Sequence, residues 1–178
     1  MAGISALPIH RRWECLSGGM LVYGSSRKEI QVADLQLTRE ELVAGLIRIG
    51  EHGIATEDDE ALDHYFSPEI VFHGPNGDLR YERLKSYFAS LRAAFDDLTV
   101  TRDHIVVDGN FVACQTSIAG RFVREFTQSP VGALPPTGDR VVFELINIFR
   151  YDETGRLAEE WMQSDTRSSL RQLRGEDG

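Results

Sequence analysis

The residues best suited to chemistry lie in the last third of the sequence, where Asp165 follows a strongly apolar segment. The run 141–149 is apolar enough to form a central strand that is covered on both faces. The turn at 152–155 and the segment 156–166 complete a β-hairpin. Side chains alternate along a strand, so Asp165 shares a face with Trp161, about 13 Å away. With Trp161 facing the interior, this pattern predicts an acid at the edge of an internal cavity.

A carboxyl group in that position suits proton transfer next to a carbonyl group. Burial disfavours its charged form and raises its pKa, so that one group can accept a proton and return it. Asp is also a favoured helix N-cap, and a short closing helix is predicted from about Thr166 to Leu173. Asp165 is therefore interpreted as an acid/base group, as the cap of that helix, or as both.

Three aromatic residues and one amide are further candidates for the cavity wall. Trp161 offers a large apolar face and one donor, while Tyr65 and Phe88 lie on the apolar stripes of predicted helices. Tyr65 also carries a phenolic hydroxyl group that can donate a hydrogen bond. Asn147 interrupts an apolar strand and needs a partner, either a substrate oxyanion or a side chain of a neighbouring strand.

The composition excludes several classes of function. The formal net charge of −9 does not suit phosphate groups, so neither nucleic acid nor an anionic membrane is expected as a partner. The two cysteines, Cys15 and Cys114, indicate no disulfide framework and favour a reducing, cytoplasmic location. No apolar run approaches the roughly 20 residues that cross a bilayer. There is no phosphate-binding loop, and the five histidines lack ligand spacing, so the sequence contains no zinc signature.

The 178 residues, 42% of them hydrophobic, suffice for one domain. Thr38 and Glu41 form a capping box that starts a first helix, which Gly50 and Gly53 are expected to end. A second helix is expected from Thr56. The next predicted elements are a short strand at 70–73, a helix at 84–95, and strands at 98–107 and 111–125 joined by a turn. Helices before a run of antiparallel strands indicate an α+β domain whose curved sheet wraps its helices.

Residues 1–36 differ from the rest in being irregular and rich in Gly, Ser and Arg. They are interpreted as an N-terminal extension that lacks the uninterrupted apolar segment of a signal peptide. A transit peptide and initiation at Met20 are the alternatives. Residues 37–174 form the predicted domain, and residues 175–178 form a short tail.

Several short motifs occur in an order that is typical of one family. They are Tyr65-Phe66-Ser67-Pro68-Glu69, Val71-Phe72-His73-Gly74-Pro75, Phe95-Asp96-Asp97-Leu98, Pro136-Thr137-Gly138, Ile148-Phe149-Arg150, Gly155-Arg156-Leu157, Glu159-Glu160-Trp161 with Asp165, and Gln172-Leu173. From about Thr38 to Leu173 the chain resembles the SnoaL-like polyketide cyclases, also called ester cyclases, of the nuclear transport factor 2-like superfamily.

This resemblance implies a cone-shaped barrel, in which a curved, mostly antiparallel sheet wraps three N-terminal helices around an apolar pocket. It also implies a homodimer formed through the sheet, with no metal or organic cofactor. In these cyclases an acid at the position of Asp165 is the general acid and base of an intramolecular aldol closure. A histidine at the position of His73 often faces the pocket, where it donates to a substrate oxygen or orients the acid. The alternative for His73 is a hydrogen bond to the following turn.

The chain departs from the family pattern after its second long strand. A histidine that the family often has there is absent, and Phe122 makes the predicted pocket more apolar, with Phe143 as a further wall residue. The expected function is acid/base catalysis, by cyclisation or isomerisation, on a hydrophobic carbonyl metabolite such as a polyketide of secondary metabolism. Two alternatives remain open. One is an epoxide hydrolase of the same superfamily, which needs a second acid in the pocket, and the other is a non-catalytic binding module.

Overall fold

The structure is a computed structural model that describes residues 37–176, all within one compact unit. The expectations for residues 1–36, for Cys15 and for the last two residues of the tail lie outside this range. No helix among the described residues is long and apolar enough to cross a membrane.

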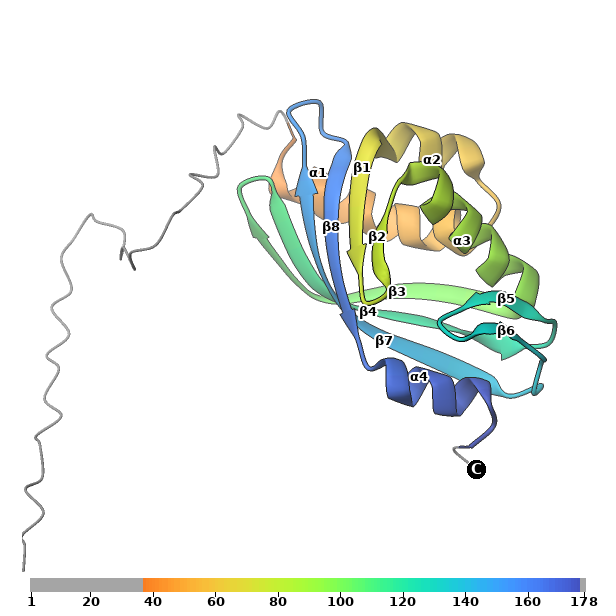
Figure 1. Ribbon diagram of the computed structural model, residues 1–178. Helices are drawn as coiled ribbons and strands as arrows, with labels where there is room; N and C mark the ends of the chain where they lie inside the picture. The colour runs from red at the N-terminus through yellow and green to blue at the C-terminus, as the bar shows by residue number, and fades with distance from the viewer. Residues whose placement is uncertain (1–36, 177–178) are drawn as a thin grey trace, which may run out of the picture. The chain divides into compact units, whose positions relative to one another are not determined.

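A curved six-stranded sheet forms the centre of the unit (Figure 1). From edge to edge its strands are β2 (Gly77–Leu79), β1 (Phe66–Gly74), β8 (Leu157–Ser164), β7 (Arg140–Tyr151), β4 (Phe111–Phe122) and β3 (Phe95–Asp108). Neighbouring strands are antiparallel except β1 and β8, which run parallel. The predicted α+β fold with a curved, mostly antiparallel sheet is confirmed. The sheet does not close into a barrel, however, because β2 and β3 remain separate edges.

Three helices cover one face of the sheet, which we call the inner face; the opposite face is the outer face (Figure 1). They are α1 (Arg39–Arg48), α2 (Asp59–Tyr65) and α3 (Tyr81–Ala94), and a π-helical segment, η1 (Ile49–Ile54), continues α1. The closing helix α4 (Thr166–Leu173) has the predicted bounds. Its Gln172 side chain accepts a hydrogen bond from Val142 N at 2.8 Å and donates one to Val142 O at 3.0 Å. These two bonds pair the backbone N–H and C=O groups of Val142 in β7, a position to which β8 does not extend.

The first helix begins with the predicted capping box. Thr38 Oγ1 accepts a hydrogen bond from Glu41 N at 3.2 Å, and the Glu41 carboxylate accepts one from Thr38 N at 2.8 Å. The helix does not end at Gly50, because the backbone there packs against β3 and continues as η1. A Cβ atom at this glycine would lie 3.0 Å from Val100 Cγ1. The second helix starts after Asp58, whose side chain caps it, rather than at Thr56.

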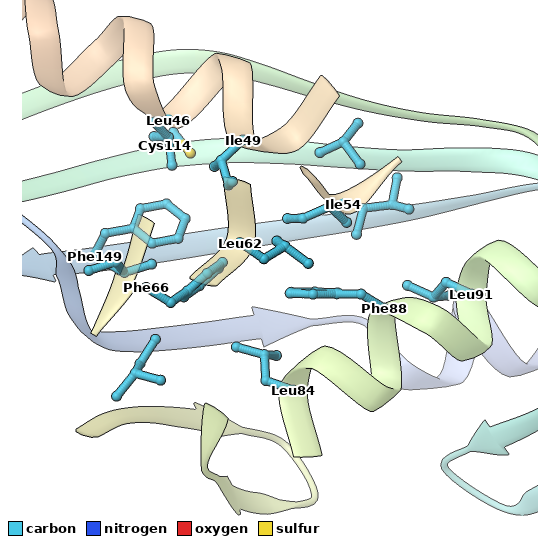
Figure 2. Close-up of a cluster of buried hydrophobic side chains, with 14 of the residues drawn as sticks. Leu46, Ile49, Ile54, Leu62, Phe66, Leu84, Phe88, Leu91, Cys114 and Phe149 are labelled. Carbon is cyan, nitrogen blue, oxygen red and sulfur yellow. The ribbon is translucent and has the colours of Figure 1, made fainter. Parts of the chain in front are cut away.

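The hydrophobic core fills much of the space between the helices and the inner face, as Figure 2 shows. The helices and η1 contribute Leu46, Ile49, Leu62, Leu84, Phe88 and Leu91, and the sheet contributes Cys114 and Phe149, all at most 7% exposed. Cys114 is therefore a core residue, as the sequence indicated.

A second, two-stranded sheet follows β4 and was not predicted. Strands β5 (Phe126–Ser129) and β6 (Gly132–Leu134) form a hairpin in the segment between β4 and β7. Phe126 anchors the hairpin, with its ring centroid 6.1 Å from that of Tyr87 and 5.8 Å from that of Phe95.

The outer face of the sheet is partly apolar. Ile146 and Ile148 of β7 are 56% and 44% exposed, whereas Val141 and Phe149 on the inner face are buried. The expectation that the segment 141–149 is covered on both faces is therefore wrong for the described residues. Because side chains alternate between the two faces of a strand, every second apolar residue of β7 lies on the outer face.

Candidate active site

A cavity of about 700 Å³ lies between the inner face and the helices. Most of its wall is apolar and comes from core residues such as Leu46 and Leu84. Exposed residues reach it from the β1–β2 turn at 75–77 and from Pro130 in the β5–β6 hairpin, so these two hairpins form part of its rim. A cavity of this size and character suits a small organic molecule.

Four of the residues predicted as pocket residues line this cavity: Tyr65, Phe88, Phe143 and Asn147. They come from α2, α3 and β7. The amide of Asn147 is 2% exposed, so its polar atoms require partners inside the protein.

Strand β8 brings a different acid to the cavity from the one expected. The pairing of β7 with β8 leaves Ala158 without a partner in β7, so β8 contains a bulge there. A bulge reverses the alternation of the side chains that follow it. Beyond it, Glu160 faces the cavity together with Met162 and Ser164, whereas Trp161 does not line it.

Glu160 is a buried carboxyl group, 7% exposed. Its Oε1 accepts a hydrogen bond from Asn147 Nδ2 at 2.7 Å, and no other residue of the described chain bonds it. Burial raises the pKa of Glu160 to about 7, although the Arg102 guanidinium group and Asn147 both act to lower it. It is the only carboxyl group among the described residues that line the cavity. Such a group can both accept and donate a proton near neutral pH.

A chain of hydrogen bonds connects Glu160 to a cation across the inner face. Asn147 Oδ1 accepts a hydrogen bond from Thr116 Oγ1 at 2.7 Å, and Thr116 Oγ1 accepts one from Arg102 Nη1. The four residues come from β8, β7, β4 and β3, which are adjacent in the sheet. Because the Asn147 oxygen is already paired with Thr116, its amino group points to Glu160.

Two tyrosines provide a hydroxyl pair in the same part of the molecule. Tyr65 and Tyr151 form a hydrogen bond through their hydroxyl groups. Burial raises the pKa of both, and the nearby charge of Glu160 acts in the same direction. Both hydroxyl groups therefore stay protonated near neutral pH. One of them donates to the other, which leaves one O–H free to donate elsewhere.

Asp165 does not line the cavity. It is exposed, and its Oδ1 accepts a hydrogen bond from Ser168 N at 3.0 Å, so it caps α4. Helix capping was one of the two interpretations of this residue. The prediction of a buried acid at this position is wrong, because it requires Trp161 to face the interior, and Trp161 faces outward.

His73 and Trp161 lie together on the outer face instead of in the cavity. Their rings are stacked, with centroids 5.4 Å apart. The imidazole lies 2.9 Å from Asp78 and 2.9 Å from Glu159, and Glu159 also pairs with Arg150 at 2.8 Å. The hydrogen bond to Glu159 is the main cause that raises the pKa of His73. Burial acts to raise the pKa of Glu159, but the hydrogen bonds from His73 and Arg150 outweigh it, so this pKa is lowered.

Phe122 is buried in the core and does not line the cavity. Its ring stacks on that of Phe95, with centroids 5.1 Å apart. The expectation that it forms the pocket wall is therefore corrected, because the first residues of β3 cover it.

Sequence reasoning missed four residues of the site: Glu160, Thr116, Arg102 and Tyr151. The available signal was Asn147, a buried amide whose partners had to come from neighbouring strands. Among residues 37–176 there is no cluster of three or more His, Cys, Asp or Glu side chains suited to a metal ion.

Comparisons with known proteins identify the family and the fold of this chain. The family model of the SnoaL-like polyketide cyclases matches residues 46–173. No curated protein matches the chain. TsrD from Streptomyces laurentii is similar at 26% identity with a TM-score of 0.61, over 78% of this chain and 98% of TsrD. IdmH from Streptomyces antibioticus is similar at 26% identity with a TM-score of 0.58, over 76% of this chain and 97% of IdmH.

A more distant structure shares the fold. It is a SnoaL-like polyketide cyclase from Agrobacterium tumefaciens, 18% identical, with a TM-score of 0.56 over 78% of this chain and 99% of that protein. The α+β architecture is thus common to proteins with little sequence identity.

Proposed function

This chain belongs to the SnoaL-like polyketide cyclase family, and from this premise we propose that it is a small-molecule enzyme that acts on a hydrophobic carbonyl metabolite such as a polyketide. The reaction is an intramolecular aldol cyclisation or an isomerisation, carried out by acid/base catalysis. One observation carries the proposal: Glu160, with a pKa of about 7, is a lone carboxyl group on the wall of a largely apolar cavity.

The proposed reaction begins with Glu160 as a carboxylate. It removes a proton from the carbon next to a substrate carbonyl group, and the C–H electron pair forms an enolate. Tyr65, the member of the Tyr65–Tyr151 pair that lines the cavity, donates a hydrogen bond to the enolate oxygen while it accepts one from Tyr151. In an aldol closure, the enolate carbon bonds to a second carbonyl carbon, and the resulting alkoxide takes the proton from Glu160. In an isomerisation, the proton returns to a different carbon. Glu160 regains its starting state in both cases.

We assign the proton transfer to Glu160 rather than to Asp165 or His73. Neither of those residues lines the cavity, and Asp165 is occupied in capping α4.

The test uses the ketone 2-tetralone as a probe, because its acidic C–H groups exchange with deuterium in heavy water. The protein is expected to accelerate this exchange, and Glu160→Gln is expected to reduce the acceleration by at least about 100-fold. Glu159→Gln is the matched control, since it removes the neighbouring carboxylate from the outer face. Nuclear magnetic resonance follows exchange and probe binding in the same sample. Equal exchange by the wild type and Glu160→Gln would remove Glu160 from the mechanism.

The two alternative functions have less support. Hydrolysis of an epoxide needs a second acid beside the first, and Glu160 is the only carboxyl group among the described residues lining the cavity. A binding module needs no acid at all, so binding of the ketone without accelerated exchange would favour it.

We also propose that the protein acts in the cytoplasm as a homodimer formed through the outer face. The support is the exposed pair Ile146 and Ile148, which a second copy would cover. Light scattering of the wild type is expected to give twice the mass of one chain, and Ile146→Lys is expected to give the mass of one chain. Val131→Lys is the control, because Val131 is 50% exposed in the β5–β6 hairpin, which borders the cavity. A wild type that stays monomeric at high concentration would contradict the dimer.

A further inference from the structure

The most unusual charged group of the described chain is the guanidinium group of Arg102, which lines the cavity. Its Nη1 donates to Thr116, and the group lies over the ring of Phe149, 5.3 Å from the ring centroid. Its Nε is buried and has no hydrogen-bond partner. No other residue of the described chain accepts a hydrogen bond from Nη2. Arg102 is therefore held in place while most of its donors remain unused.

The charge of Arg102 is also uncompensated. No carboxylate among the described residues lies within ion-pair distance of it. Glu160 is close enough for the cation to lower its pKa, but that pKa is still about 7, so near neutral pH the acid is uncharged in a large fraction of molecules. A partly buried cation without a counter-ion is costly, and it attracts any anionic group that enters the cavity.

We propose that the cavity binds a ligand that carries a carboxylate group, and that Arg102 anchors this group. A planar guanidinium group binds a carboxylate through two parallel N–H···O bonds, and the unused N–H donors of Arg102 Nη1 and Nη2 can form them, whereas Nε is covered by protein. The rest of the ligand faces the apolar wall, so the ligand class is a hydrophobic carboxylic acid. This inference deepens the proposed function, because it concerns the same cavity, but it does not depend on which residue transfers the proton.

Binding of two matched probes tests the inference without any turnover. The probes are 2-naphthoate and 2-naphthamide, which share shape and size and differ in charge. Isothermal titration at about pH 6 is suitable, because the aromatic acid is ionised there while Glu160 is largely protonated. The wild type is expected to bind the carboxylate at least about tenfold more tightly than the amide.

Substitutions of two arginines test which residue causes the preference for the carboxylate probe. Arg102→Met is expected to remove the preference for naphthoate while the affinity for naphthamide changes by less than about threefold. Arg83→Met is the matched control, because Arg83 is an exposed arginine on the cavity rim, and it should leave the preference unchanged. If Arg102→Met fails to fold, Arg102→Lys keeps the charge without the planar fork and is expected to show a reduced preference.

Equal wild-type affinities for the two probes would overturn the inference, and so would an unchanged preference in a folded Arg102→Met. Its failure is distinguishable from failure of the proposed function. Glu160→Gln is expected to keep the preference for naphthoate at about pH 6, since Glu160 is already largely uncharged there, whatever the substitution does to deuterium exchange.

Discussion

Glu159 and Glu160 are neighbours in the sequence, yet β8 directs them to opposite faces of the sheet, and their chemistry differs accordingly. On the outer face, Glu159 pairs with His73 and Arg150, and its pKa is lowered. On the inner face, Glu160 receives one neutral hydrogen bond, from Asn147, and its pKa is raised to about 7. The residue type is the same, so the surroundings determine which glutamate can exchange protons near neutral pH.

The difference lies in how each face compensates charge. The outer-face cluster consists of Asp78, His73, Glu159 and Arg150, in which acids and bases alternate and satisfy one another. The inner face instead separates an acid from a cation by two neutral side chains. Incompletely compensated groups in a cavity are those that retain the capacity to react or to bind.

The largest predicted effect concerns the dependence of stability on pH. The pKa of Glu160 is raised from 4.5 to about 7 in the folded protein. Between about pH 4.5 and pH 7, Glu160 therefore keeps its proton in the folded state, whereas in the unfolded state it has released it. The stabilising contribution is complete below about pH 4.5, falls as the pH rises, and is lost above about pH 7. Its size is on the order of 3 kcal/mol.

Urea unfolding at several pH values measures this contribution. Glu160→Gln is expected to flatten the decline between about pH 4.5 and pH 7. Glu159→Gln should leave the decline between about pH 4.5 and pH 6.5 in place, because its own lowered pKa affects stability on the acid side and its bond to His73 affects it only above about pH 6.5. Identical pH profiles for the wild type and Glu160→Gln would show that Glu160 titrates normally. The contrast between Glu159 and Glu160 would then be wrong.

Most of the fold was predictable because its signals are local. The capping box at Thr38, the turn at 108–110 and the closing helix after Asp165 each depend on residues close in the sequence, and each occurs as predicted. The second helix was predicted to start at Thr56, but its N-cap is Asp58, which is an error of only a few residues in a local signal. The π-helical continuation at Gly50 was not predictable, because it depends on contact with Val100, fifty positions away.

The site was less predictable than the fold, for a physical reason. One unpaired residue, Ala158, reverses the alternation in β8, and no local pattern announces this bulge. The side of the strand predicted to face the interior is that of Trp161, whereas Glu160, Met162 and Ser164 line the cavity. The indole lies on the outer face against His73, so its size was a misleading guide to the interior.

Two neighbouring hydroxyl residues of β4 extend the comparison of the faces. Thr116→Val keeps the shape of the side chain but leaves Asn147 Oδ1 and Arg102 Nη1 without their partner, so it is expected to cost about 2 kcal/mol of unfolding free energy. Ser117→Ala removes only a hydrogen bond to Glu144 on the outer face and is expected to cost less than about 0.5 kcal/mol. Urea denaturation measures both. Equal losses of unfolding free energy would indicate that the hydrogen bonds on the inner face contribute no more to stability than the one on the outer face.

The role of Asp165 gives a smaller effect. Asp165→Ala removes the N-cap of α4 and is expected to cost about 1 kcal/mol, whereas Asp165→Asn retains capping and should be nearly neutral. Neither change is expected to alter deuterium exchange of 2-tetralone by more than about twofold. A large loss of exchange in a stable Asp165→Asn protein would return the acid/base role to this residue.

The smallest effect is expected from His73 on the outer face. Its pKa is raised from 6.5, so its contribution to stability is complete below about pH 6.5 and disappears as the pH rises through the raised value. Because the pair is partly exposed, His73→Gln should lower stability by less than about 1 kcal/mol near pH 6 and have no effect near pH 9. Urea unfolding at the two pH values, with an imidazole titration by nuclear magnetic resonance, measures both parts. A larger loss, or one that persists near pH 9, would contradict this expectation. It would mean that the outer-face cluster stabilises the sheet through contacts other than its ion pairs.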